Sequence, residues 1–380
     1  MLIDEGAYMV IKRKSICVIT FPPMKAGLTP LSNLIDILTS SFKEIHLITG
    51  NDGYNYFTNN KYIHLYGIFH SQGTGKINRI KNYIFTQLKI AHALLKIIGK
   101  IDVCIFFLGG ETLTLSLIPT KIFNKKSVII LSGYSIKYEK DTLSKMVAKL
   151  CTINLNLADK IILYSPRLIE EWNLKKYSHK ILIAPRHFLN FSNFKLNTEF
   201  TQRNDLIGYV GRLSEEKGIL NFIKSIPLLL KQKPFLNILI IGDGDLKNNV
   251  KNYLSNNSLE NNVKLVGWSS NEDLPKYLNL LKLLVIPSYT EGLPNVMLEA
   301  MACGTPVLAT KVGAIPDIIK DEETGFLMEN NSPECIAENI IRALEFPNLG
   351  NIATKSEKLV ENNFTYEKAV ERYSIIFNKI

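Results

Sequence analysis

Residues 291–307 read EGLPNVMLEAMACGTPV, and this stretch predicts a turn, a helix and the start of a buried strand. Pro294 suits the first helical position, because its missing N–H costs nothing there. Gly304 and Pro306 end the helix, and the apolar run Val307–Ala309 predicts a strand. The pattern is typical of an α/β domain whose parallel sheet is buried on both faces.

The start of this helix is a predicted anion site that two carboxylates flank. N–H groups in a first helical turn lack a carbonyl one turn earlier, and the helix dipole adds positive potential. The residues expected to hold a phosphate in this way are Gly292, Leu293, Asn295 and Val296. Glu291 precedes the helix, and Glu299 lies about one and a half turns into it. A nucleotide sugar requires such a site, and the placement disfavours the acid–base pair of a glycosidase.

The second half of the chain alternates apolar strands and helices, as a doubly wound domain does. The predicted strands are Leu206–Val210, Leu236–Ile241, Val263–Val266, Leu283–Ile286 and Val307–Ala309. Ser269–Glu272 predicts a capping box, and Ser332-Pro333 predicts another helix start. Ligands of such domains bind outside the carboxyl ends of the strands. We therefore expect the loops there to line one crevice, with Gly211, Gly242, Asp243 and Gly267 among the donor-binding residues.

Two cations after the first of these strands, Arg212 and Lys217, are candidate catalytic residues together with Glu291. Cations beside a diphosphate stabilise the charge that develops on it when a glycosidic bond breaks. The alternative is a pair of solvated charges balanced by Glu215 and Glu216. The Gly242-Asp243-Gly244 segment lacks the third glycine of a dinucleotide fingerprint, which favours a nucleoside pocket or a simple tight turn. Trp268 is expected to border the base or to pack in the core.

The first half alternates in the same way, with more spare sequence. Its predicted strands are Ile16–Thr20, Ile45–Ile48, Val103–Phe107, Val128–Leu131 and Ile161–Leu163. A helix is predicted at 76–99 and a second at 138–158. The expected apolar stripe of the first helix consists of Ile77, Ile80, Ile84, Leu88, Ala91, Leu95 and Ile98. Residues 184–204 lack any period and predict a linker, with His187 on its surface.

Composition limits the classes of protein that this chain can be. Its 380 residues, 46% hydrophobic, suggest two soluble globular domains. The five cysteines are scattered, which favours reduced thiols over a disulfide or zinc framework. Lys12–Lys14 and the apolar run after them resemble the start of a signal peptide, but Pro22-Pro23 ends the run too early. None of the six histidines has a partner at the spacing of a metal or nucleophile site.

Several of these segments resemble family 4 glycosyltransferases, the retaining class with the GT-B fold, also described as glycosyl transferases group 1. Residues 291–299 resemble the E-x7-E signature of that family. The other similar segments are Ala158–Ser165, Tyr209–Gly218, Ile240–Gly244, Leu265–Trp268 and Val312–Asp317. The resemblance is dense from about 205 to 330 and sparse before 155.

The resemblance implies a fold of two Rossmann-like doubly wound domains that face each other across a cleft. Residues 1–185 would bind the acceptor, 186–204 would be the linker and 205–364 would bind the nucleotide sugar, while 365–380 would form a helix that crosses back to the first domain. It assigns Arg212 and Lys217 to the donor diphosphate, Glu291 to the sugar and Glu299 to the ribose. Gly27 would approach the donor phosphates, and Ser132 stands where the family commonly has a histidine.

The activity that the resemblance implies is transfer of a sugar from a UDP-sugar or another nucleotide sugar to a glycan or lipid-linked acceptor, with retention, in cell-surface polysaccharide or glycolipid synthesis. Arg212, Lys217 and the helix start can supply the positive potential of a metal, so neither a metal nor another cofactor is expected. The alternatives are another GT-B enzyme, such as a sugar-nucleotide epimerase, and a non-catalytic sugar-nucleotide binder. A Rossmann oxidoreductase would not explain Glu291 or Arg212.

Charge is distributed unevenly along the chain. Residues 1–200 contain 26 basic and 13 acidic side chains, whereas 201–380 contain 19 and 22. The helices at 76–99 and 138–158 carry many of the lysines, among them Lys140, which predicts a cytoplasmic protein whose first domain docks on an anionic membrane. The alternative is that both helices pack on the sheet and their lysines only aid solubility. Nucleic acid is not expected, because no nucleic-acid motif accompanies the charge.

Overall fold

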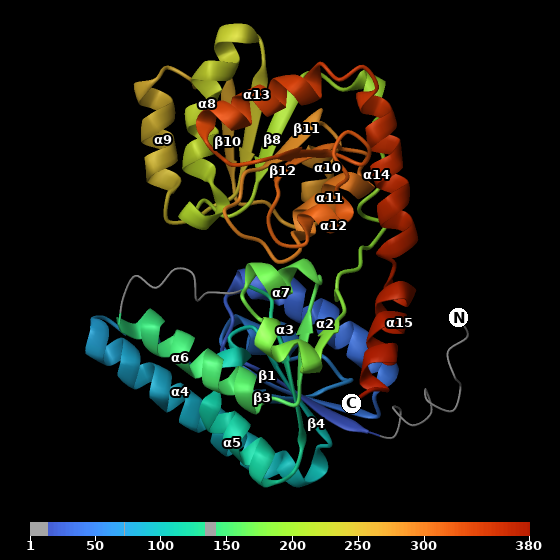
Figure 1. The fold of residues 1–380 in the computed structure, drawn as a ribbon. Helices are drawn as coiled ribbons and strands as arrows, with labels where there is room; N and C mark the ends of the chain where they lie inside the picture. The colour runs from blue at the N-terminus through green and yellow to red at the C-terminus, as the bar shows by residue number, and fades with distance from the viewer. Residues whose placement is uncertain (1–13, 72, 134–141) are drawn as a thin grey trace. The chain divides into compact units, whose positions relative to one another are not determined.

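The computed structural model describes residues 14–71, 73–133 and 142–380. The chain divides into two compact units (Figure 1). Unit 1 comprises Met1–His187 and Tyr366–Ile380, and unit 2 comprises Phe188–Thr365. Three residues that the sequence analysis used, namely Lys12, Arg13 and Lys140, lie outside the described residues.

Unit 1 is built on a seven-stranded sheet in the order β3-β2-β1-β4-β5-β6-β7, and every pair is parallel. The strands are β1 (Ser15–Thr20), β2 (Glu44–Thr49), β3 (His64–Gly67), β4 (Val103–Phe107), β5 (Lys126–Ile130), β6 (Lys160–Leu163) and β7 (Ile181–Ile183). Ile16 lies opposite Ile45 on one side and Val103 on the other. Apolar runs occupy the central strands because both faces of the sheet are covered.

The main helices of unit 1 are α2 (Leu28–Ser41), α3 (Asp52–Phe57), α4 (Lys76–Ile97), α5 (Thr114–Ile122), α6 (Thr142–Leu157), α7 (Arg167–Glu171) and α15 (Tyr366–Phe377). The C-terminal helix α15 packs against α2 (Figure 1). The Tyr366 hydroxyl donates to the carbonyl of Asp36 at 2.9 Å, and the rings of Phe42 and Phe377 meet edge to face. The last helix of the chain therefore completes the core of the first unit.

Unit 2 has a six-stranded sheet in the order β10-β9-β8-β11-β12-β13, again parallel throughout. The strands are β8 (Leu206–Val210), β9 (Asn237–Ile241), β10 (Val263–Gly267), β11 (Leu283–Ile286), β12 (Val307–Thr310) and β13 (Phe326–Met328). The main helices are α8 (Ile219–Gln232), α9 (Lys247–Asn256), α10 (Leu274–Leu278), α11 (Asn295–Ala302), α12 (Ile315–Ile318), α13 (Pro333–Leu344) and α14 (Leu349–Asn363). Strand order reverses between β8 and β11, which is where doubly wound domains bind ligands.

The segment between the two sheets is bound to unit 2 over much of its length. The Asn279 side chain accepts from the backbone N–H of Asn197 and Thr198, and its amide donates to the carbonyl of Lys195. The Arg203 guanidinium donates to the carbonyls of Thr198, Leu281 and Cys303. These hydrogen bonds attach the segment to unit 2, and the division between the two units falls directly after His187.

The predicted α/β class is confirmed, and each predicted strand is present, with ends that differ by two residues or fewer. Three strands were not predicted, namely β3, β7 and β13, which are only three or four residues long and lie at or next to sheet edges. The helix start at Ser332 is confirmed, since its hydroxyl accepts from the N–H of Cys335. The capping box at Ser269–Glu272 is wrong, because α10 begins at Leu274 with Asp273 as its N-cap and no side-chain cap, while Ser270 accepts from the N–H of Asp273 in the turn before the helix. Pro294 is the N-cap of α11 and not its first residue.

The structure decides burial at three places, and at one of them, His187, it contradicts the prediction. Helix α4 is present, but its buried face contains Tyr83, Ile90, Leu94 and Ile97, while Ile77, Ile84, Leu88 and Leu95 of the expected stripe are exposed. A hydrogen bond favours the observed face, because the Tyr83 hydroxyl donates to the Thr112 hydroxyl at 2.8 Å within the unit. His187 is buried against the ring of Tyr164 instead of lying on a surface linker. Trp268 does not pack in the core, since 68% of it is exposed.

Candidate functional site

The candidate site of unit 2 lies at the reversal of strand order, where the loops after β8 and β11 meet. Lys217 ends the short helical turn after β8, and its ammonium donates to Glu291 Oε1 at 2.6 Å. Ser288 follows β11, and its hydroxyl donates to the same oxygen at 2.7 Å. Glu291 is 9% exposed, so its carboxylate is held by two fixed donors in a largely dry place. Lys217 and Glu291, which are 74 positions apart in sequence, thus form one ion pair.

A third loop, after β12, closes over Glu291. Gly313 has φ of 60°, and a Cβ on it would lie 2.2 Å from the carbonyl oxygen of Glu291. The N–H of Ala314 donates to the carbonyl of Gly292 at 2.8 Å, and the Thr310 hydroxyl donates to the carbonyl of Ser288. Only glycine combines that φ with so close a backbone approach. The β11 and β12 loops are therefore fixed relative to each other by Gly313.

Glycines also join the loops after β8, β9 and β10. The N–H of Gly211 donates to the carbonyl of Ile241, and the N–H of Gly242 donates to that of Gly267 at 2.7 Å. Gly242 has φ of 146°, and a Cβ on it would lie 1.8 Å from the carbonyl oxygen of Gly211. The predicted donor-binding residues Gly211, Gly242 and Gly267 are therefore neighbours at the carboxyl edge of the sheet.

The two candidate cations differ in their surroundings. The Arg212 side chain is 57% exposed and lies 3.4 Å from a carboxylate oxygen of Glu216, whereas the Lys217 side chain is 26% exposed. The buried Tyr209 hydroxyl donates to the carbonyl of Arg212 at 2.8 Å and thereby fixes the backbone beneath it. The Arg212 guanidinium is thus anchored at its base and open to an anionic ligand at its tip.

Glu299 is the most perturbed carboxyl of this region. It lies in α11, whose first residue is Asn295, and it is 6% exposed. Burial raises the pKa of Glu299 from 4.5 to about 7. No hydrogen bond to its carboxylate is found within the described residues, which leaves its oxygens available to a ligand. A buried carboxyl with such a pKa is typical of a functional site.

The residues that the sequence predicts to hold a phosphate lie around the start of α11. Gly292 and Leu293 are buried, and Asn295 and Val296 are partly exposed at the helix end. The first N–H groups of an eight-residue helix point out of its end and attract an anion. Glu291, Glu299 and this helix start belong to one short segment, so a ligand at the helix start is within reach of both carboxylates.

Asp243, another predicted donor-binding residue, is paired within its own loop. Asp243 follows β9, but its carboxylate is engaged by Lys247 Nζ at 2.6 Å and by the N–H of Gly244. The hydrogen bond from Lys247 lowers the pKa of Asp243. Gly27 and Ser132 belong to unit 1, where they follow β1 and β5 at the carboxyl edge of the other sheet.

One residue of the candidate site, Ser288, was not predicted from the sequence. Ser288 shares Glu291 Oε1 with Lys217, and it stands three residues before the E-x7-E segment. A serine at the end of a strand carries no distinctive signal, since turn residues are common there. Only the hydrogen bond reveals its role in orienting Glu291.

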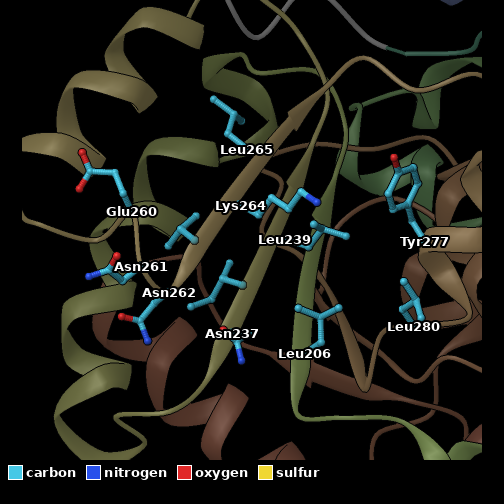
Figure 2. A pocket seen from close by; sticks show the side chains of 12 residues that line it. Leu206, Asn237, Leu239, Glu260, Asn261, Asn262, Lys264, Leu265, Tyr277 and Leu280 are labelled. Atoms are coloured by element: carbon cyan, nitrogen blue, oxygen red, sulfur yellow. The ribbon is translucent and has the colours of Figure 1, made fainter.

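A cavity of about 640 Å³ lies elsewhere in unit 2 (Figure 2). Its wall includes the amino-terminal residues Leu206, Asn237 and Val263 of β8, β9 and β10, together with Tyr277 and Leu280. The candidate site is at the carboxyl ends of these strands. The cavity is therefore separate from the residues that the sequence predicts to bind a donor.

One group in unit 1 has the composition of a metal site. Ligand atoms of Glu44, His46 and His64 all lie within 4.8 Å of one another, on the neighbouring strands β2 and β3. The two imidazole rings are stacked with an interplanar angle of 24°. Lone pairs in nearly parallel planes do not converge on one ion, so these side chains would have to turn before they could bind a metal.

Comparison with known proteins finds a family model that matches most of unit 2. The family described as Glycosyl transferases group 1 matches residues 191–364. The amylovoran biosynthesis glycosyltransferase AmsK of Erwinia amylovora is 32% identical over 166 residues, 42% of this chain and 40% of that protein. The capsular polysaccharide biosynthesis glycosyltransferase CapM of Staphylococcus aureus is 26% identical over 68% of this chain and 70% of that protein. The chain thus spans less than half the length of AmsK.

Solved structures extend the likeness to the first unit. The crystal structure of Anabaena HepE in complex with UDP and glucose has a TM-score of 0.76 and 16% identity, and the match covers 97% of this chain and 100% of that one. Likeness at this identity shows the fold. We conclude that residues 191–364 match the glycosyl transferases group 1 family and that the chain has the GT-B fold.

Proposed function

We propose that this protein is a retaining glycosyltransferase that moves a sugar from a UDP-sugar to a glycan or lipid-linked acceptor. The observation that carries the proposal is the Lys217–Glu291 pair beside the start of α11, in a domain of the group 1 family. UDP is favoured as the nucleotide because HepE was crystallised with UDP and glucose, and because an Escherichia coli relative, 28% identical over 44% of this chain, is named for UDP-Gal.

The chemistry that this site supports is departure of a diphosphate. Arg212, Lys217 and the N–H groups at the start of α11 all present positive charge. Such charge binds a diphosphate more strongly as its glycosidic bond breaks, which lowers the barrier to transfer. Because these groups supply the potential themselves, we propose that transfer needs no metal and no other cofactor.

Lys217 is suited to join the two ends of the donor. An ammonium group has three N–H donors, and one of them is used for Glu291 Oε1. The other two remain for diphosphate oxygens, while Glu291 keeps a second oxygen for a sugar hydroxyl. Glu299 would accept from the ribose hydroxyls one and a half turns into α11. In this arrangement a single ion pair sets the spacing between sugar and diphosphate.

The acceptor and the place of action are proposed from the relatives. CapM and AmsK are named for capsular polysaccharide and amylovoran biosynthesis, and the E. coli relative is named for a diphosphoundecaprenol substrate. We propose a cytoplasmic enzyme, peripheral on the membrane, that extends a cell-surface glycan on such a carrier. Among the described helices, none is long and apolar enough to cross a bilayer.

The decisive experiment is incubation of the full chain with a panel of UDP- and GDP-sugars and lipid-extract acceptors, following both nucleotide release and a glycosylated product. Transfer that requires an acceptor supports the proposal. Nucleotide release together with a changed free sugar, without an acceptor, would identify a sugar-nucleotide epimerase instead. Tight donor binding without turnover on any acceptor of the panel would favour a non-catalytic binder.

A further inference from the structure

Helix α4 has two apolar faces, and only one of them is buried in unit 1. The second face, called the docking row here, consists of Ile77, Ile84, Phe85, Leu88 and Leu95, which are 82%, 44%, 52%, 50% and 46% exposed. At 3.6 residues per turn these five side chains fall within an arc of about 100° and extend along about 27 Å of the helix. A surface helix normally turns its apolar stripe to the core, so this row requires a separate explanation.

Positive charge accompanies the docking row without any compensating acid. Residues 53–101 contain no aspartate or glutamate, while seven lysines and arginines lie in the same segment. Lys81, Lys89 and Lys96 are exposed on α4, and the Lys81 ammonium lies 5.9 Å from the centre of the Phe85 ring. Among the described residues, no carboxylate forms an ion pair with these three lysines. The row and its cations form one amphipathic surface.

The neighbouring helix α5 enlarges the apolar surface of this part of unit 1. It packs against α4 (Figure 1) and exposes Ile118, Ile122 and Phe123 by 42%, 73% and 51%. Lys125 and Lys126 follow directly in the sequence. A long basic helix and an adjacent apolar helix end are thus both exposed on the same unit.

We propose that α4 lies in the plane of an anionic membrane, with the docking row at the boundary between headgroups and acyl chains and with its lysines on the headgroups. A helix with bulky apolar residues on one face and lysines beside them binds lipid surfaces in this way. A second copy of the chain is a poor occupant, because it would bring the same uncompensated positive charge against the first. The proposal deepens the proposed function, since a membrane-bound α4 would hold the enzyme where a lipid-linked acceptor resides.

The test is flotation of the full chain with vesicles of phosphatidylcholine alone and of phosphatidylcholine mixed with phosphatidylglycerol, at low and high salt. The wild type is expected to float with the anionic vesicles only, and less at high salt. Lys81→Gln/Lys89→Gln/Lys96→Gln should weaken binding on the order of 100-fold, because each cation near such a surface contributes about 1 kcal/mol, or about fivefold. The docking-row variant, Leu88→Gln/Leu95→Gln, should bind the anionic vesicles at least about tenfold more weakly, since two apolar anchors are lost.

Matched controls separate the surface from general stickiness and from misfolding. Phe235→Gln removes a side chain that is 92% exposed in unit 2, and Lys224→Gln/Lys231→Gln removes exposed charge from α8, so both variants should float like the wild type. All variants should keep the wild-type melting temperature, because every altered side chain is exposed. Equal flotation by the docking-row variant and the wild type, or flotation with neutral vesicles alone, would overturn the proposal. A concentration-dependent dimer that the docking-row variant abolishes would also overturn it.

The result is independent of whether the proposed activity is correct. A wild type that floats with anionic vesicles but transfers no sugar would support the docking surface and contradict the enzyme function. A docking-row variant that transfers sugar to a water-soluble acceptor at the wild-type rate, but not to a carrier lipid in vesicles, would support both. Flotation is therefore measured before any activity.

Discussion

The ammonium of Lys217 and the carboxylate of Glu291 lie 2.6 Å apart and connect the loops on the two sides of the strand-order reversal in unit 2. Glu291 also accepts from Ser288, so one carboxylate oxygen has two donors. Lys217→Ala would leave a nearly buried carboxylate without its counter-ion, which costs stability as well as charge stabilisation.

We expect Lys217→Ala to lower kcat/KM by on the order of 100-fold or more and to lower the melting temperature. The double variant Lys217→Met/Glu291→Gln should recover most of the lost stability, because no unpaired charge remains, but none of the activity. Lys276→Ala, which breaks an exposed pair with Asp273, is the control and should change neither quantity. Activity in the double variant would contradict the assignment of the pair to the donor.

Substitution of Arg212 is expected to lower activity without lowering stability. Its guanidinium is mostly exposed and its ion pair with Glu216 is weak, so Arg212→Ala should leave the free energy of unfolding within about 1 kcal/mol of the wild type. Turnover should fall by on the order of 100-fold, since a contact to the departing diphosphate is lost. Steady-state kinetics and thermal denaturation measure the two effects, and unchanged turnover would remove Arg212 from the site.

Glu299 should make stability depend on pH. Its pKa is about 7 in the folded protein and near 4.5 when unfolded, so the folded state binds the proton more tightly. Ionisation of this carboxyl therefore costs stability as pH rises from about 4.5 to 7, and the full cost persists above that range. Glu299→Gln removes the cost, so the variant should gain relative to the wild type between about pH 5 and pH 8, by at most about 3 kcal/mol.

Urea denaturation of both proteins at the two pH values measures this gain. A difference in stability that stays constant with pH would contradict a raised pKa for Glu299. Because ribose hydroxyls donate to the ionised form, UDP affinity of the wild type should also rise as pH passes through about 7, and Glu299→Gln should reduce that rise to the part that ionisation of the terminal UDP phosphate causes.

Gly313→Ala should damage the site through the backbone. The new Cβ would lie 2.2 Å from the carbonyl oxygen of Glu291, in addition to the strain of a φ of 60°. Gly75→Ala is the matched control, because Gly75 has φ of 79° but no atom within 4 Å of the position that a Cβ would take. We expect the control to lose about 1–2 kcal/mol of stability and keep UDP binding, whereas Gly313→Ala loses more and binds UDP poorly. Calorimetry of both variants with UDP distinguishes these outcomes.

Stereochemistry and metal dependence test the proposed chemistry directly. The product should keep the anomeric configuration of the donor, as NMR of a freshly formed product reveals. Chelator should leave activity intact, because Arg212, Lys217 and the start of α11 supply positive charge, and because Lys247 already occupies the carboxylate of Asp243. Inversion at the anomeric carbon, or activity lost with EDTA and restored by a divalent ion, would contradict these expectations.

Much of the candidate site could be predicted from local pattern, for a physical reason. The turn and helix of residues 291–302 follow from short-range rules, namely proline near a helix start and glycine and proline after its end. Parallel strands end at a common edge, so the loops with Arg212, Gly242 and Glu291 could be assigned to one crevice without knowing the strand order. The donor-binding roles of these residues remain predictions.

Tertiary structure decided what depends on partners distant in sequence. The pairing of Lys217 with Glu291, the role of Ser288 and the approach of Gly313 to Glu291 each join separate loops, and no local period encodes them. The short strands β3, β7 and β13 form because a neighbouring strand supplies hydrogen bonds, and at three or four residues each is too short to show a period in the sequence. Helix α4 shows the same limit, since its 3.6-residue period predicts one apolar stripe, whereas packing buries a different face of the helix.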